Sequence, residues 1–368
     1  MPTTDAPDRR AIDPRSGIVG QPRALEALRR AAVRPVHAYL LVGPRGSGVE
    51  EGARALGAAL VEAAGDPRIA RGRHPDVVEF RPSANEYSVE RDVRGGVLPE
   101  IHAAPIEGPR KCVVLFEAER LNDPSANALL KSIEEPPPRT VVIVVTDSAD
   151  ALAITIRSRC QRIDFGALSD ELVVEALLAD GVPADAARLA ASLAGGRLDR
   201  ARTLAGPLAP LRLAFADAPA RVTGYGATVL DLATGLGAAL DDAVAALEAA
   251  QTRDLAEADA EAERLGYATR TAQAMRRRLV EAQKRTLRRA RTEALLEGIA
   301  AIESVYRDAL APDAAPRNLD RAPLRVGARE AARALDVCAA TRRSFTFNPT
   351  EGLLLEHLLL HLPPVASA

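Results

Sequence analysis

Residues 38–48 read Ala-Tyr-Leu-Leu-Val-Gly-Pro-Arg-Gly-Ser-Gly, and an Ala- and Leu-rich segment follows from about 49 to 62. The five residues at the start form a short apolar run of the kind that a buried parallel strand shows. The glycines then open a loop, and the segment beyond the loop has the composition of a helix. A strand, a glycine-rich loop and a helix in this order are the setting of a phosphate-binding loop.

Further apolar runs repeat the pattern downstream. They lie at 112–116 and 141–145, with a short one at 162–165, and a helix is expected over about 124–134, where three prolines stop it. Alternating strands and helices predict an α/β domain built on a parallel sheet. Its ligand site would lie beyond the carboxyl ends of the strands.

The second half of the chain has a different, helical character from Ser169 almost to the end. We expect a flexible N-terminus (1–16), the α/β domain (17–166), a small helical lid (167–207) and an all-α domain (208–368). The last helix is expected to open at Asn348-Pro349, a capping residue followed by a proline at the first helical position.

Composition narrows the class of protein. The 368 residues include 48 basic and 50 acidic side chains, a net charge of −2, which excludes a polycationic nucleic-acid coat. Three cysteines cannot form a disulfide framework and indicate a reducing compartment. Neither a signal peptide nor an apolar run of about 20 residues is visible, so a cytoplasmic protein with no membrane contact is expected.

The glycine-rich loop lacks the chemistry of a working nucleotide site. Gly43, Gly46 and Gly48 supply the loop's shape, but Val49 stands where G-x-x-x-x-G-K-[ST] has its lysine and Glu50 where it has the hydroxyl that holds Mg²⁺. Valine cannot neutralise phosphate oxygens, and a carboxylate would repel them. We therefore expect no bound cofactor in this loop.

The strand at 112–116 shows a second defect. An active Walker B strand ends in Asp-Glu, whereas this one ends in Glu117-Ala118. The metal-binding carboxylate is one methylene longer and the general base is missing. Glu119 lies one residue further on, where strand alternation aims it elsewhere. ATP hydrolysis by this chain is not expected.

Five segments in order carry a family resemblance. They are GPRGSG (43–48), VVLFEAERLN (113–122), PSANALLKSIEEPPPRT (124–140), VVIVVTD (141–147) and ITIRSRCQRIDF (154–165). The chain resembles the AAA+ clamp-loader subunits of bacterial DNA polymerase III across about 20–166, and most closely the delta-prime type, whose Walker residues are lost. The resemblance implies an AAA+ domain, a lid and a helical collar through which the subunits form a ring.

The resemblance also implies a role for Ser158-Arg159-Cys160. In the family this arginine reaches the γ-phosphate of ATP on the neighbouring motor subunit, which holds the nucleotide and Mg²⁺; Ser158 and Cys160 would support it. A planar, permanently charged guanidinium can contact two phosphate oxygens. The implied partners are the gamma/tau motor and delta subunits, with the sliding clamp and primed DNA reached through the complex. A surface arginine in an ordinary ion pair is the simpler reading of Arg159 alone.

Other candidate residues carry less weight. Thr146 occupies the sensor-1 position but reads as a strand-end hydrogen bonder. Leu198 or Asp199 falls at the sensor-2 arginine's position, which leaves that sensor unassigned. Residues 61–80 contain no cysteine and only His74, so the zinc module of many relatives is absent and no metal is predicted.

Charge is polarised in the last third of the chain. Residues 241–263 hold eight acids and one arginine, and 270–291 hold nine bases and one acid. Pairing between antiparallel helices or a solvated face is favoured over DNA contact, because the basic stretch has no aromatic residue to stack a base.

Two other functions remain open. One is an active AAA+ ATPase with an atypical loop, either a clamp-loader motor or a branch-migration helicase. The other is a degenerate AAA+ scaffold in a different assembly.

Overall fold

The computed structural model describes Ile12 and residues 17–83, 86–222, 226–264, 269–345 and 350–364. They form two compact units, Met1–Gly181 with Ala194–Ala201, and Val182–Leu193 with Arg202–Ala368. The segment expected as a lid, 167–207, contributes to both units, and a separate lid remains a proposal. The expected helix start at Asn348 lies outside the described residues, as does the N-terminus to residue 16 apart from Ile12.

A parallel sheet forms the centre of the first unit. Its strands are β1 (Ala38–Val42), β2 (Val77–Phe80), β3 (Lys111–Leu115), β4 (Thr140–Thr146) and β5 (Gln161–Asp164). They lie in the order β2-β3-β4-β1-β5, and every pair is parallel. The predicted parallel sheet is therefore confirmed, with β2 as a strand that the sequence had not predicted.

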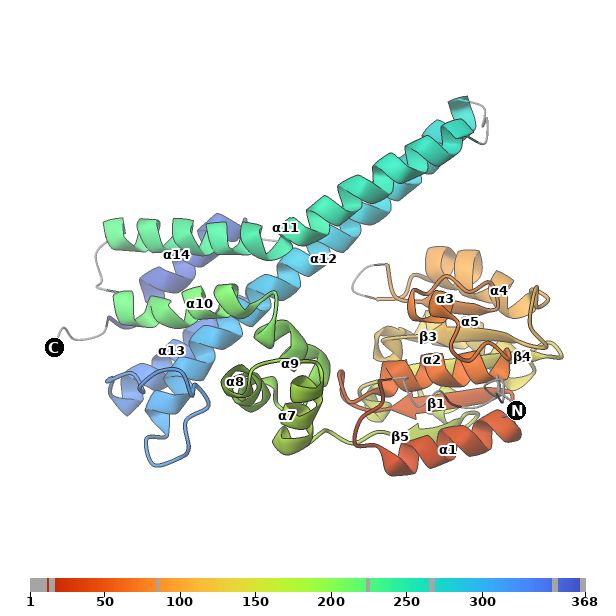
Figure 1. The fold of residues 1–368 in the computed structure, drawn as a ribbon, viewed down its shortest axis with the longest axis horizontal. Coiled ribbons are helices and arrows are strands. Elements are labelled where there is room, and N and C mark those ends of the chain that lie inside the picture. Colours follow the sequence, from red (N-terminus) through yellow and green to blue (C-terminus); the bar gives the residue numbers. More distant parts are fainter. Residues whose placement is uncertain are drawn as a thin grey trace, which may run out of the picture. The chain divides into compact units, whose positions relative to one another are not determined.

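Helices cover both faces of this sheet (Figure 1). They are α1 (Pro22–Val33), α2 (Val49–Leu60), α3 (Pro67–Ala70), the π-helical η1 (Val89–Val97), α4 (Leu98–His102), η2 (Ala118–Arg120), α5 (Asp123–Glu134), η3 (Ala149–Ala151) and α6 (Ile154–Arg157). A further helix, α7 (Asp170–Ala179), follows β5 and does not belong to these two layers. Alternation along β1 sends Tyr39 and Leu41 into the core under α1 and α2, and Leu40 into the core under η1, α4 and α5.

In the described residues of the rest of the chain, all regular secondary structure is helical, as predicted. Its helices are α8 (Ala184–Ala194), α9 (Leu198–Ala205), α10 (Ala209–Arg221), α11 (Gly226–Arg264), α12 (Thr269–Leu310), α13 (Ala328–Ser344) and α14 (Glu351–His361). In the second unit α11 and α12 form a long hairpin, with α14 beside α11 and with α10 and α13 against α12 (Figure 1). Phe215 and Ile302 are fully buried in its core. No helix in the described ranges has the length and apolar character to cross a membrane.

Candidate functional site

The glycine-rich loop joins β1 to α2 at the carboxyl edge of the sheet. Val42 lies opposite Thr146 in the register of β1 and β4, and the amide of Gly43 donates to the Thr146 carbonyl at 3.0 Å. Gly46 and Gly48 have φ values of 75° and 92°, a region that residues with a Cβ rarely adopt. The loop thus has the backbone geometry that its glycines predict.

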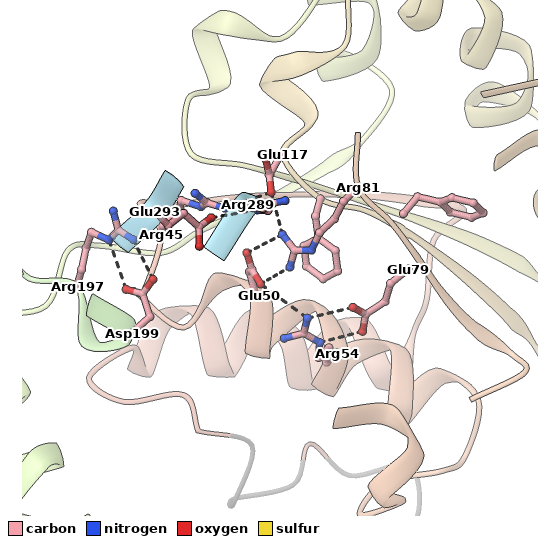
Figure 2. Close-up of polar contacts among 12 residues, drawn as sticks. Arg45, Glu50, Arg54, Glu79, Arg81, Glu117, Arg197, Asp199, Arg289 and Glu293 are labelled. Atoms are coloured by element: carbon pink, nitrogen blue, oxygen red, sulfur yellow. Dashed lines mark hydrogen bonds and ion pairs between the residues drawn. The ribbon is translucent and has the colours of Figure 1, made fainter. Parts of the chain in front are cut away.

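Ion pairs fill the space beside this loop (Figure 2). Arg81, which follows β2, places Nη2 2.6 Å from Glu50 Oε2 and Nη1 3.1 Å from Glu117 Oε1. Arg45 from the loop also reaches Glu117 Oε1 at 3.1 Å, and Arg120 reaches its Oε2 at 3.2 Å. Glu117 is only 4% exposed, so three arginines compensate one buried carboxylate.

A second layer of contacts holds the arginines in place. Arg54 on α2 makes a two-bond pair with Glu79 at 2.8 and 3.0 Å. Burial alone would lower the pKa of Arg54, but the bonds to Glu79 outweigh it and raise the pKa. The guanidinium carbons of Arg81 and Arg54 lie 4.3 and 5.1 Å from the centre of the Phe116 ring.

The backbone at Glu117 is also unusual. Its φ of 54° is left-handed, a conformation that disfavours residues with a Cβ. Contacts from Arg45, Arg81 and Arg120 hold the side chain in this position at the end of β3.

An additional carboxylate lies against the loop. The amide of Leu198 donates to the Gly46 carbonyl at 3.1 Å, and a Cβ added at Gly46 would lie only 1.9 Å from Asp199 Oδ1. Arg197 pairs with Asp199 at 2.9 Å. An acidic side chain, itself paired with Arg197, therefore lies on the loop at Gly46.

The residues present do not fit a magnesium nucleotide. Val49 is buried and apolar, and the carboxylates of Glu50 and Glu117, which would have to face Mg²⁺, are engaged by arginines. Asp199, paired with Arg197, occupies the space beside Gly46, the loop glycine that would approach phosphate. The loop keeps its shape while arginines from the chain itself engage the carboxylates beside it.

Thr146 and Glu119 pair with each other. The Thr146 hydroxyl lies 2.9 Å from Glu119 Oε2 and 3.0 Å from the Ser148 carbonyl, and it accepts from the Ser148 amide at 3.2 Å. Ala118, in the position of the general base, is fully buried. Thr146 thus makes the strand-end hydrogen bonds that its position indicates.

Arg159 lies between α6 and β5. All three guanidinium nitrogens have partners in the chain: Nε and Nη2 contact the Glu134 carboxylate at the end of α5, and Nη1 donates to the Thr155 carbonyl at 2.8 Å. Glu134 is placed there because the prolines after it end α5. The Arg159 side chain remains 34% exposed.

The neighbours of Arg159 have structural roles in this chain. The Ser158 hydroxyl donates to the Thr155 carbonyl at 3.3 Å and lies 3.4 Å from Arg159 Nη1. Burial raises the pKa of Cys160 to about 12, so this side chain is a neutral thiol at physiological pH. Both side chains pack around the turn from which Arg159 projects.

Sequence reasoning missed the arginines that fill the site. Arg81 was overlooked because the run Val77–Phe80 was not read as a strand. The three apolar residues of this run, Val77, Val78 and Phe80, were the available signal, since a strand there places Arg81 at the same edge as the loop. No spacing in the sequence indicates that Arg45 and Arg54 turn toward acids more than 20 residues away.

Part of the chain is similar in sequence to known proteins. Residues 20–169 match the family described as DNA polymerase III, delta subunit. The delta' subunits of Bacillus subtilis and Pseudomonas aeruginosa are 29% and 36% identical to this chain, over 47% and 44% of it and 56% and 53% of their own length. The tau subunit of Bacillus subtilis is 32% identical over 43% of this chain and 30% of its own length.

The chain thus spans little more than half of the delta' relatives, and the matched part contains the loop, the ion-paired site and Arg159. Residues 20–169, less than half of the chain, are therefore similar to the family described as DNA polymerase III, delta subunit, and the relatives named delta' share this similarity.

Proposed function

We propose that this chain is a non-hydrolysing subunit of the replicative clamp loader, which donates Arg159 to the ATP site of a neighbouring gamma/tau motor subunit. The observation that carries the proposal is a contrast within one domain. The chain's own loop is filled by ion pairs around the almost fully buried Glu117, whereas Arg159 and its partner Glu134 lie at the surface, with 34% and 41% of their side chains exposed.

The chemistry of Arg159 suits this role. Its charge does not depend on pH, and its planar group presents parallel N–H donors that match two phosphate oxygens. In the free chain the Glu134 carboxylate binds the Arg159 guanidinium. A phosphate carries more negative charge and can replace this carboxylate without a change of fold. Such an arginine contributes about 10³–10⁵ in turnover in GTPases.

In the assembled complex the chain would act with motor and delta subunits to place the sliding clamp on primed DNA. ATP and Mg²⁺ would belong to the motor subunit, and this chain would bind neither. The lid, 167–207, and the collar, 208–368, would serve assembly of the ring.

Replacement of Arg159 by Ala tests the proposal in a complex reconstituted with the motor and delta subunits. The complex should assemble normally, while clamp- and DNA-stimulated ATP hydrolysis should fall by at least tenfold. Arg162→Ala is the matched control, because Arg162 is an exposed arginine nearby with an ion pair to Asp164. Unchanged hydrolysis with Arg159→Ala would reject the role.

The similarity to a tau subunit supports one alternative, an active ATPase of the motor or branch-migration type. Binding of labelled ATP to the isolated chain separates the two functions: micromolar, Mg²⁺-dependent binding would favour the motor. Purification of native complexes tests a scaffold role, since motor and delta subunits should appear as the main partners.

A further inference from the structure

A row of exposed basic side chains lies on helix α12 of the long hairpin. It consists of Arg277, Lys284, Arg285 and Arg288, and we call it the basic stripe. At 3.6 residues per turn these positions fall within an arc of about 100° and span about 16 Å along the helix. The four side chains therefore share one face.

This face is not the one that contacts α11. The bonds between the two helices are the ion pairs Asp241–Arg291 (2.7 Å) and Asp259–Arg276 (3.1 Å) and the reciprocal Gln251–Gln283 amide bonds (3.2 and 2.8 Å). Arg276 and Gln283 lie about 130° and 150° around α12 from the centre of the stripe, and Arg291, at about 70°, lies just outside its edge. The expected pairing of the acidic and basic segments thus occurs, but it uses other bases.

The stripe has little compensation from acids. Within the described part of the chain, the side chains of Arg277, Arg285 and Arg288 make no hydrogen bond or ion pair. Lys284 pairs with Glu281 at 3.2 Å, and both side chains are more than half exposed, so water screens that pair. Three permanently charged groups consequently face solvent together.

The composition of the face indicates its ligand. Besides the bases, the arc from 277 to 292 holds only Glu281 and Thr292, without an aromatic or large apolar side chain. Protein interfaces depend on such anchors, and single-stranded nucleic acid needs aromatic platforms. A duplex backbone needs only cations and hydrogen-bond donors. Exposed acids on α11 (Glu248, Asp254 and Glu257) would keep a polyanion on the α12 side.

We propose that the basic stripe binds the sugar–phosphate backbone of duplex DNA without reading its sequence. The inference deepens the proposed function, on which it rests for the choice of DNA. It requires neither a partner subunit nor Arg159, so the two proposals can fail separately.

The test measures binding of the full chain to a fluorescent DNA duplex by anisotropy, across a range of salt concentrations. The triple variant Arg277→Gln, Arg285→Gln, Arg288→Gln should bind at least tenfold more weakly, and the slope of log K against log salt should fall by about 2.7 for three lost phosphate contacts. Single-stranded oligo-dT should bind more weakly than the duplex.

A matched triple variant controls for net charge. Arg325, Arg329 and Arg333 are exposed arginines of the same unit, and their replacement by Gln removes the same three charges. This control should stay within threefold of the unchanged chain, as should Arg159→Ala. Equal weakening by both triple variants would overturn the proposal. Competition by polyglutamate as strong as that by duplex DNA would also overturn it, because the stripe would then be a site for acidic protein.

Discussion

Replacement of Arg81 by Met tests whether the ion pairs beside the loop stabilise the first unit. Arg81 joins Glu50 and Glu117 and covers the Phe116 ring, and methionine keeps much of its volume without the charge. Loss of one partner from a buried ion pair costs about 3–5 kcal/mol. Because the Arg81 side chain is 30% exposed, screening reduces this to about 2–3 kcal/mol.

The expected loss corresponds to a fall in Tm of roughly 4–12 °C for a unit of this size. Native-state hydrogen exchange of the amides of β3 and β4 reports the unfolding of the first unit separately from the second. Arg30→Met is the matched control: Arg30 pairs with Glu26 on the surface of α1, and its loss should cost less than about 0.5 kcal/mol.

A double-mutant cycle isolates the pair itself. If Arg81 compensates Glu50, the Glu50→Gln change should cost less in the Arg81→Met background, with a coupling of about 1–2 kcal/mol. Strictly additive effects, or a loss below about 0.5 kcal/mol for Arg81→Met, would refute the assigned role of the network.

Two further predictions concern Arg159 and the second unit. Glu134→Gln removes the carboxylate that holds Arg159, so basal hydrolysis by the reconstituted complex should rise about three- to tenfold, an order-of-magnitude figure for one released charge contact. No rise should occur in the Glu134→Gln, Arg159→Ala double variant. A fall in hydrolysis as deep as that of Arg159→Ala would mean that Glu134 orients the arginine. Burial opposes ionisation of Asp320, but hydrogen bonds from Arg212 and Arg321 hold its pKa at about 2. This stabilisation is present above about pH 4 and is lost as the pH falls toward 2. Asp320→Asn should therefore lower the free energy of unfolding by about 2 kcal/mol at pH 7 in urea titrations. A difference in the free energy of unfolding that persists at pH 2 would contradict this dependence on the charge of Asp320.

The sheet and the loop could be predicted because local pattern determines them. The buried runs at β1, β3 and β4 are continuous and apolar, and the glycines after β1 permit only a few backbone conformations. β2 escaped prediction because it has only four residues and contains Glu79, whose charge is compensated by Arg54 from a different helix. The presence of a charged residue in a short strand can be explained only when its partner is known.

The chemistry of the site was predictable only as a set of absences. Val49 and Glu50 show that a nucleotide's usual partners are missing, but nothing in their spacing indicates what replaces them. The replacement depends on contacts between residues 31 to 72 positions apart, Arg81 with Glu50 and Arg45 with Glu117. Such pairs follow from the topology of the sheet, which brings the carboxyl ends of β1, β2 and β3 to one edge.

These contacts mean that the loop differs from a working nucleotide-binding loop by more than the loss of a lysine. With Val49 as the only change, Glu117 would remain almost fully buried without a metal ion, at a cost of several kcal/mol. Arg45, Arg81 and Arg120 supply the positive charge that a metal would otherwise bring. The site therefore keeps its carboxylates compensated without nucleotide, which suits a domain whose proposed task is to hold an arginine in place for a neighbouring subunit.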